Sequence, residues 1–274
     1  MPATTRFSGR VAFVTGAGSG IGRATAERLA AEGAAVGCVD RDSEALADAV
    51  EAVTAVSSAP VIAIECDVSD PLAVEHAFAC IESAAGVPDV VCNVAGVGGF
   101  SHTHETTDDE WERMIAVNLT GTFVVSRAAL KRWSALVAEE PKRYRRRRGR
   151  PASEAIPRPV IVNVASSAGL MGQPYSAAYC ASKGGVVQLT KALAVEYLEV
   201  GFRVNAVAPG GVDTPLLASF ALPEGASGSL LGRLISPFGF CPPSDIAAVI
   251  AFIASEEAGP MTGSIVPVDG GLTA

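Results

Sequence analysis

The chain has 274 residues, of which 49% are hydrophobic, and a formal net charge of −8. A chain of this length and apolar content can bury one large core, so we predict a single domain over residues 1–274. Its apolar runs of about 4 to 8 residues are too short to cross a bilayer, and its first residues lack the apolar stretch of a secretory signal. We therefore expect a cytoplasmic protein without a membrane partner.

Basic residues are concentrated in one segment. Eight of the 21 fall between Lys142 and Arg158, and outside residues 139–158 the chain holds 13 basic and 26 acidic residues. Such an acidic body repels nucleic acid, and we expect no nucleic-acid partner. The six cysteines lie far apart without a C-x-x-C pair, so neither a disulfide framework nor a zinc site is predicted.

Short β-branched runs alternate with helical stretches along the chain. Strand-like runs without polar alternation are typical of a parallel sheet that is buried on both faces. The predicted strands are Val11–Gly16, Ala35–Asp40, Val61–Cys66, Asp89–Asn93, Val160–Val164, Arg203–Ala208 and Ile265–Val268, and the predicted helices are Arg23–Glu32, Ser43–Val56, Pro71–Ala85, Asp108–Leu136 and Ser176–Val200.

This alternation predicts an α/β fold with a doubly wound parallel sheet, a Rossmann fold of about seven strands with helices on both faces. Ligands of such sheets bind outside the carboxyl ends of the strands, so the residues after each strand are the candidates for chemistry. Two segments interrupt the alternation. We interpret residues 139–159 as a basic inserted loop at the surface and residues 214–243 as a possible substrate lid.

The segment after the first predicted strand reads TGAGSGIG. Residues without a Cβ let the backbone approach a pyrophosphate, and the N-terminus of the next helix then faces the anion. A Gly-rich turn without a ligand is the structural alternative. The dinucleotide contacts expected here are Gly16, Ser19, Gly20, Ile21 and Gly22.

Asp40 ends the second predicted strand, where a carboxylate can accept hydrogen bonds from ribose hydroxyls. A 2′-phosphate would meet a like charge there, so we expect NAD as the cofactor, while the neighbouring Arg41 leaves NADP open. A helix cap is the structural alternative for Asp40. Polar and small residues after the next two strands reach the same edge, although ordinary turns explain them equally well. The cofactor contacts expected there are Asp67, Val68, Asn93, Ala95 and Gly96.

Tyr179 and Lys183 lie four residues apart, on one face of a predicted helix. A tyrosine with an ordinary pKa of ~10 is a poor base at neutral pH, but a lysine cation and an oxidised nicotinamide both favour the phenolate. An exposed Tyr and Lys pair is the structural alternative. The strand just upstream delivers Ser166 and Ser167 to the same edge, and Asn118 is a polar residue within an apolar helical stretch.

Together these motifs resemble those of the short-chain dehydrogenase/reductase family over nearly the whole chain. The TGAGSGIG turn resembles the family's TGxxxGIG, residues 93–96 its NNAG, Tyr179-x-x-x-Lys183 its YxxxK, and Pro209-Gly210 the proline and glycine after strand six. There are two departures. Val94 replaces the second Asn of NNAG, and residues 139–159 form a longer segment than the family usually has.

The resemblance implies a catalytic tetrad of Asn118, Ser166, Tyr179 and Lys183. Tyr179 would be the general acid/base, and Ser166, preferred to Ser167 for its spacing from the tyrosine, would steady the substrate oxygen. Lys183 would lower the Tyr179 pKa and bind the nicotinamide ribose, and Asn118 would hold a water that relays protons. The cofactor contacts expected at this end are Tyr179, Lys183, Pro209, Gly210, Val212 and Thr214, of which the last two would receive the carboxamide.

The three histidines, His76, His102 and His104, raise the question of a metal. The His102-x-His104 pair beside Glu105 lacks a third ligand at a recognisable spacing. We therefore predict no metal site and interpret the pair as part of the rim or wall of the substrate pocket.

We expect an NAD(H)-dependent oxidoreductase that interconverts a secondary alcohol and a ketone. The alternatives are an NADPH-dependent 3-oxoacyl reductase and a non-catalytic dinucleotide sensor or nucleic-acid binder that uses Arg145–Arg148. Family members usually pair the helices that begin here at Asp108 and Ser176, which implies a homotetramer. A hydrophobic small substrate is expected from the apolar residues Phe220, Leu222, Leu230, Leu231, Leu234, Ile235 and Phe238.

Overall fold

The computed structural model describes residues 5–140, 158–218, 220–236 and 238–274. Within these ranges one seven-stranded sheet has the order β3-β2-β1-β4-β5-β6-β7, and every neighbouring pair of strands is parallel. This arrangement confirms the predicted doubly wound fold. The strand order reverses between β1 and β4, which is where such sheets form a ligand crevice.

Each predicted strand is present, with ends that agree to within one residue. Strands β1, β5 and β6 are buried along their whole length, as expected for β-branched runs that are covered on both faces. The strands are β1 (Val11–Thr15), β2 (Ala35–Asp40), β3 (Val61–Glu65), β4 (Val90–Asn93), β5 (Val160–Val164), β6 (Arg203–Pro209) and β7 (Ile265–Val268).

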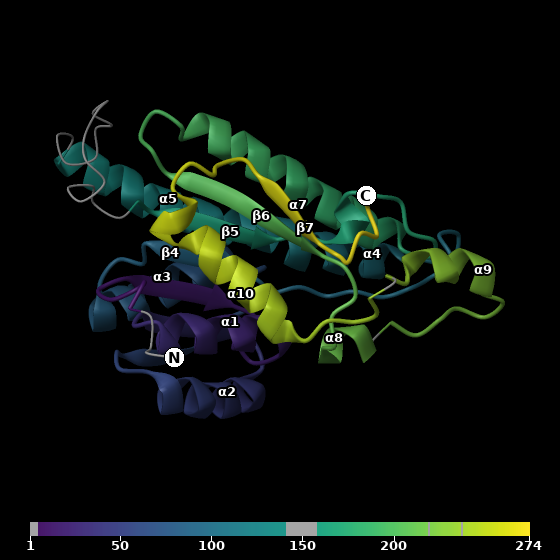
Figure 1. Cartoon of the computed structure of the whole chain (residues 1–274), viewed down its shortest axis with the longest axis horizontal. Coiled ribbons are helices and arrows are strands. Elements are labelled where there is room, and N and C mark those ends of the chain that lie inside the picture. The colour runs from purple at the N-terminus through teal and green to yellow at the C-terminus, as the bar shows by residue number, and fades with distance from the viewer. Residues whose placement is uncertain (1–4, 141–157, 219, 237) are drawn as a thin grey trace.

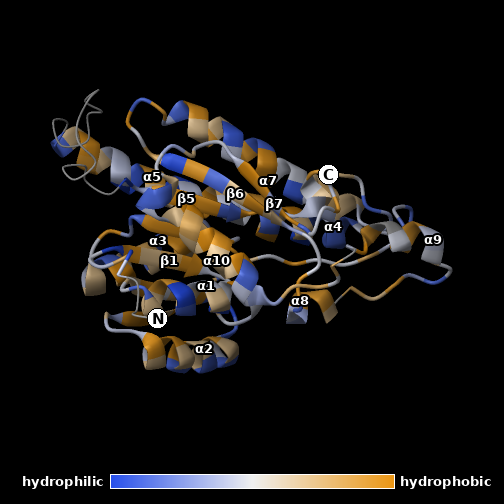
Figure 2. Ribbon diagram, viewed as in Figure 1, coloured by the Kyte–Doolittle hydropathy of each residue, from blue (hydrophilic) through white to orange (hydrophobic). Residues whose placement is uncertain are grey.

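Helices cover both faces of the sheet and divide the core into two layers. Helices α1 (Gly20–Ala31), α2 (Ser43–Val56) and α10 (Pro243–Ala254) contribute to the apolar cluster on one face. Helices α3 (Pro71–Ala85), α5 (Thr122–Glu139) and α7 (Ala177–Glu196) contribute to the cluster on the other (Figure 1). Figure 2 shows α10 coloured mostly as hydrophobic, because its apolar side chains pack on α1 and the strands. The remaining elements are α4 (Asp108–Ile115), α8 (Pro215–Ala218), α9 (Gly228–Leu231) and short turns.

Local capping explains where several helices begin. Asp42 accepts hydrogen bonds from two N–H groups of the first turn of α2, and Asp70 accepts one, from Leu72, at the start of α3, which has Pro71 as its first residue. Thr107 and Glu110 form a capping box at the start of α4. These short polar residues satisfy helix N–H groups that otherwise lack partners.

The structure differs from two sequence expectations. The single helix predicted over Asp108–Leu136 is divided into α4 and α5 by the π-helical segment η1 (Ala116–Gly121), which contains Asn118. Helix α10 was not predicted, although Pro243 at its start and Ile246, Ala247 and Ile250 at helical spacing are a usable signal. The predicted basic loop falls largely on residues 141–157, so Arg145–Arg148 lie outside the described residues. No helix of the described ranges is long and apolar enough to span a membrane.

Candidate active site

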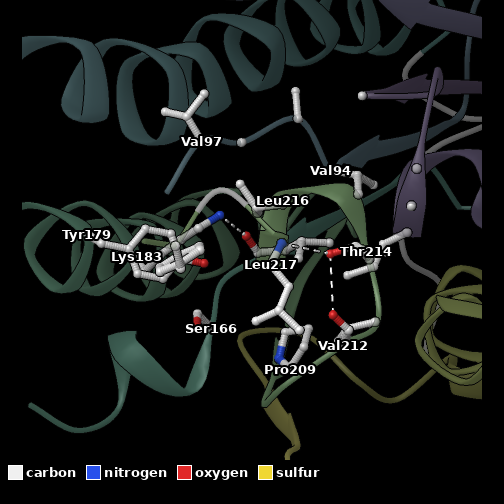
Figure 3. Close-up of a pocket in the computed structure, with 18 of the residues that line it drawn as sticks. Val94, Val97, Ser166, Tyr179, Lys183, Pro209, Val212, Thr214, Leu216 and Leu217 are labelled. Atoms are coloured by element: carbon white, nitrogen blue, oxygen red, sulfur yellow. Dashed lines mark hydrogen bonds between the residues drawn. The ribbon is translucent and has the colours of Figure 1, made fainter. Parts of the chain in front are cut away.

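A cavity of about 600 Å³ opens at the carboxyl ends of the strands. One end is lined by the TGAGSGIG turn and the ends of β2 and β3, and the other by Tyr179, Lys183 and apolar residues of the segment 214–243, which we call the border segment. Figure 3 shows Tyr179 and Lys183 on one side of this pocket and Leu216 and Leu217 across from them. The cavity therefore joins the predicted nucleotide end to the predicted chemical end.

The Gly-rich turn packs too tightly for side chains. A Cβ on Gly22 would lie 1.9 Å from the carbonyl oxygen of Gly16, so only glycine fits where α1 begins beside β1. Ser19 precedes α1 and makes no side-chain capping bond to the first helical turn. The first N–H groups of this 12-residue helix thus lack a side-chain cap next to the cavity, which suits a pyrophosphate.

Asp40 lies at the end of β2 with both carboxylate oxygens engaged by backbone N–H groups. Its Oδ2 accepts from Gly18 across 2.9 Å and its Oδ1 accepts from Asp42 across 3.1 Å. Arg41 and Asp67 line the same end. Hydrogen bonds from Ser69 lower the pKa of Asp67 despite its partial burial, and the charge of Arg41 contributes.

The departure from the NNAG motif leaves the turn after β4 intact. The hydroxyl of Thr15 accepts hydrogen bonds from the backbone N–H groups of Val94 and Ala95 across 3.0 and 3.1 Å. The side chain at position 94 is not needed for these bonds, and Val94 lines the cavity. The substitution of Asn by Val is therefore compatible with the turn.

Asn93 lies beneath the cavity and not in its wall. Its Nδ2 donates to Ser126 across 3.1 Å and to Oδ1 of Asn163 across 2.8 Å, and Asn163 donates in turn to Thr190 across 2.9 Å. These four buried side chains join β4, β5, α5 and α7. The Asn93 side chain thus supports the site from beneath, and contact between Asn93 and a cofactor stays a prediction.

Tyr179 and Ser166 meet at the chemical end. Burial raises the pKa of the Tyr179 phenol, and a hydrogen bond with the Ser166 side chain opposes this effect. Ser166 also accepts a hydrogen bond from the N–H of Ala168 across 3.1 Å, which orients its hydroxyl. Ser167 lines the cavity too, but its hydroxyl accepts from Gln173 across 3.2 Å. The preference for Ser166 over Ser167 agrees with this geometry.

Lys183 is buried one helical turn after Tyr179. Its Nζ lies 5.9 Å from the centre of the Tyr179 ring and donates to the carbonyl oxygen of Val164 across 2.8 Å. Burial lowers the pKa of Lys183 to about 8. In the protein alone, burial raises the pKa of Tyr179, whereas the sequence suggested that this lysine would lower it.

Asn118 is fully buried in η1, outside the cavity wall. Its Oδ1 accepts from the N–H of Val97 across 2.8 Å, while its Nδ2 donates to the carbonyl of Val97 across 2.9 Å and to Ser182 across 3.0 Å. These bonds tie the loop after β4 to α7. Thr122 donates to the backbone carbonyl of Asn118 across 2.7 Å, as the π-helical segment leads into α5. The side chain of Asn118 therefore holds the backbone that carries the site.

The substrate end of the cavity is mostly apolar. Of the apolar residues expected there from the sequence, Leu230 and Phe238 are not in the wall and are 42% and 86% exposed. Sequence reasoning missed Phe100 and Gln173, which lie in loops where no periodic pattern marks them. The predicted wall residues that the structure places in the cavity are Phe220, Leu222, Leu231, Leu234 and Ile235.

Two side chains hold the border segment against neighbouring loops. The Tyr175 hydroxyl accepts from the N–H of Ser227 across 2.8 Å, and the Tyr175 carbonyl accepts from the N–H of Ser101 across 2.8 Å. His102 packs edge-on against Tyr175 with ring centres 5.1 Å apart, and its Nε2 donates to the carbonyl of Glu224 across 2.9 Å. Tyr175 has a φ of 62°, a strained value that these contacts maintain.

Of the histidine pair, His102 has this structural role. The rings of His102 and His104 are 5.5 Å apart. Across the described ranges, no group of three or more His, Cys, Asp or Glu side chains is placed to hold a metal.

The remaining predicted contacts follow β6. Pro209, Gly210, Val212 and Thr214 all line the cavity, and the Thr214 hydroxyl donates to the carbonyl of Val212 across 3.3 Å (Figure 3). Among the predicted catalytic and cofactor-contact residues, Asn93 and Asn118 are thus the two that lie outside the wall, and the others line one cavity.

A Gly-rich strand-to-helix turn that shares one cavity with a Ser, Tyr and Lys cluster defines a dinucleotide-dependent oxidoreductase. The profile of the short chain dehydrogenase family matches residues 10–224, and the chain belongs to this family. Members of the family bind a nicotinamide dinucleotide and act on secondary alcohols or the corresponding ketones.

Individual proteins of the family are similar to the chain over its whole length. It is 37% identical to 2-(S)-hydroxypropyl-CoM dehydrogenase 3 of Xanthobacter autotrophicus, over 99% of both chains. The crystal structure of levodione reductase superposes with a TM-score of 0.82 at 34% identity, covering 97% of this chain and 98% of that one. A 3-ketoacyl-(acyl-carrier-protein) reductase from Brucella melitensis, complexed with NADH, also gives a TM-score of 0.82, at 31% identity and with 98% and 100% coverage.

Proposed function

We propose that the protein interconverts a secondary alcohol and a ketone with NAD(H), and that Tyr179 is the general acid/base. The observation that carries this proposal is the meeting of Ser166, Tyr179 and Lys183 in the cavity that also holds the Gly-rich turn. When bound, the dinucleotide supplies the site that accepts or donates the hydride.

In the direction of alcohol oxidation, the Tyr179 oxygen takes the hydroxyl proton of the substrate. Ser166 donates a hydrogen bond to the substrate oxygen and holds it beside Tyr179. Lowering the pKa of a tyrosine from ~10 to near 7 requires about 4 kcal/mol of preference for the phenolate. Burial opposes that shift in the protein alone. The charge of Lys183 and the positive charge of an oxidised nicotinamide would therefore have to lower the pKa of Tyr179.

Lys183 has a second task in this proposal. Its Nζ already donates to Val164 across 2.8 Å and keeps two further protons for ribose hydroxyls when it is charged. A pKa of about 8 leaves it mostly protonated at neutral pH. Asn118 joins the loop at Val97 to helix α7 at Ser182 through its hydrogen bonds. It thereby helps to position Lys183, which follows Ser182 in the helix.

NAD is favoured over NADP by the charge at the end of β2. Two backbone N–H groups hold the Asp40 carboxylate in its position at the end of β2. A 2′-phosphate would therefore meet a fixed negative charge there. Arg41, which lines the same end, is the feature that favours NADP. An NADPH-dependent 3-oxoacyl reductase is the second candidate, since the chain resembles a 3-ketoacyl reductase, although that protein was complexed with NADH.

The test is a spectrophotometric assay with a panel of secondary alcohols and ketones, each with NAD(H) and NADP(H). We expect turnover with NAD(H) and its loss in Tyr179→Phe, which should still bind NADH and enhance its fluorescence. NADH binding without turnover of any substrate would instead favour a non-catalytic dinucleotide-binding protein. A preference for NADPH with 3-oxoacyl substrates would favour the second candidate.

We further propose that the protein works as a cytoplasmic homotetramer without a nucleic-acid partner. Large apolar side chains are exposed on the outer faces of α4, α5 and α7, including Trp111, Phe123 and Val195 at 43%, 41% and 75%. Exposed apolar patches of this kind mark contact surfaces. Light scattering coupled to gel filtration separates monomer, dimer and tetramer by mass.

A further inference from the structure

Phe220 of the border segment lies directly beside the proposed acid/base. Its ring is perpendicular to the ring of Tyr179, with centres 5.6 Å apart, and perpendicular to the ring of Phe100, with centres 4.9 Å apart. Phe100 comes from the loop after β4, Tyr179 from α7 and Phe220 from the segment after α8. Three elements that are distant in sequence thus form one aromatic wall at the reacting end of the cavity.

A glycine makes room for this ring. A Cβ on Gly98 would lie 2.2 Å from Cζ of Phe220 and 2.4 Å from Cε2, well inside contact distance. Gly98 does not line the cavity, and its φ is not in the left-handed region. Its lack of a side chain therefore matters for the seating of Phe220, and an alanine there would displace the ring.

The wall around Phe220 carries little charge. Among the side chains that the structure describes, the charged ones in the cavity wall are Lys183 at the chemical end and Asp40, Arg41 and Asp67 at the adenosine end. Leu217, Leu231 and Ile235 are further apolar residues of the same border segment in the cavity wall. Lys183, which the proposed function assigns to the ribose hydroxyls, is the one charged side chain described at this end, so a carboxylate or phosphate on the substrate would lose its hydration there for little electrostatic gain.

We propose that Phe220, seated on Gly98, sets the size limit for the apolar group of an uncharged alcohol or ketone that binds beside Tyr179. The inference rests on the proposed function for the identity of the reacting group, but the size limit itself is a property of binding. Removing the ring opens the wall next to the substrate carbon. A side chain at position 98 would displace the Phe220 ring and so change the same size limit. It can do this only in a protein that still has Phe220.

The experiment measures the affinity of two neutral ketones, 2-butanone and 2-acetonaphthone, by calorimetry in the presence of NAD⁺, which cannot reduce them. Phe220→Ala should tighten binding of the naphthyl ketone by roughly tenfold, with little change for 2-butanone. Gly98→Ala should alter the ratio of the two affinities in the parent protein. In the Phe220→Ala background it should have no further effect, which is the non-additivity expected of residues in contact.

Phe238 offers a matched control. It belongs to the same segment but is 86% exposed and lies outside the cavity wall, so Phe238→Ala should leave both affinities unchanged. The inference is overturned if Phe220→Ala leaves the ratio of affinities unchanged, if Gly98→Ala acts equally in both backgrounds, or if neither ketone binds to any variant. Phe220→Leu provides a milder change should the alanine variant fold poorly.

Turnover with NADH is measured in parallel and separates this inference from the proposed function. Shifted affinities without reduction of either ketone would leave the size limit in place and contradict the proposed reaction. Reduction of both ketones at the same relative rates in all variants would support the reaction and contradict the role of Phe220.

Discussion

The carboxylate of Asp40 accepts a hydrogen bond from the backbone N–H of Gly18 across 2.9 Å, which joins the end of β2 to the Gly-rich turn. A Cβ on Gly18 would lie 3.0 Å from the same carboxylate oxygen, so the two residues are in close contact. An acidic side chain is thereby held where the adenosine ribose of a dinucleotide is expected.

The charge of Asp40, and not its shape, should determine the choice of cofactor. Asp40→Asn keeps an oxygen that can accept from Gly18 but removes the repulsion of a 2′-phosphate, so kcat/KM with NADPH relative to NADH should rise roughly tenfold or more. Steady-state rates with both cofactors and one substrate measure this ratio. Asp42→Asn, which alters the cap of α2 nearby, is the control and should not change it. An unchanged ratio in Asp40→Asn would exclude Asp40 as the selecting residue.

Burial of Lys183 should make stability depend on pH in a defined direction. Its pKa falls from 10.5 in an unfolded chain to about 8 in the folded protein, so between these values the unfolded state binds more protons. The full cost of burying the charge is present below pH 8 and is relieved as pH rises toward 10.5. The unfolding free energy of the parent, relative to Lys183→Met, should increase over this window by up to about 3 kcal/mol.

Urea unfolding at several pH values between 7 and 10.5 measures this difference. Lys191 lies on the same helix but is exposed, so Lys191→Met should give a difference that does not vary with pH. If the difference in unfolding free energy between the parent and Lys183→Met also did not vary with pH, the lysine would be better hydrated than its burial implies.

Loss of the Tyr175 hydroxyl should release the border segment. Tyr175→Phe leaves the N–H of Ser227 without its acceptor. A net hydrogen bond contributes about 1 kcal/mol, so its loss should increase the population in which the border segment is detached roughly fivefold. Limited proteolysis within residues 214–243 should accelerate by this factor, and KM for the alcohol should rise more than kcat falls. Tyr197→Phe is the control, because Tyr197 stacks on Phe202 away from this segment. Equal proteolysis rates in both variants would contradict the role of Tyr175.

Arg203 should be a major contributor to stability far from the chemistry. Its buried guanidinium donates to the carbonyls of Ile253 across 2.8 Å and Ser255 across 2.9 Å, at the end of α10. Burial lowers the Arg203 pKa to about 10, so the side chain stays charged near neutrality. Arg203→Met leaves these carbonyls unsatisfied and should cost roughly 2 to 4 kcal/mol of unfolding free energy, measured with guanidinium. The exposed Arg127→Met should change it by less than about 0.5 kcal/mol.

Local pattern was enough to predict the fold type and most of the cavity. The seven strands were predictable because each is a short β-branched run, and parallel pairing places all their carboxyl ends on one edge. Tyr179 and Lys183 were predictable because helical spacing brings residues four apart together. Residues that follow strands, such as Asp40 and Ser166, reach the cavity for the same topological reason.

Which polar residues face the cavity and which support it depends on contacts between distant parts of the chain. Asn93 and Asn118 turn into the protein because their amides find partners on other elements, at Asn163 and Ser182, and no sequence spacing encodes those distances. The seating of Phe220 on Gly98 likewise joins positions more than a hundred residues apart. The helices, the strands and the chemistry that each can offer follow from the amino-acid sequence, because they depend on neighbours along the chain. The three-dimensional packing decided the shape of the substrate pocket, because a side chain takes its position from whatever atoms already occupy the space around it.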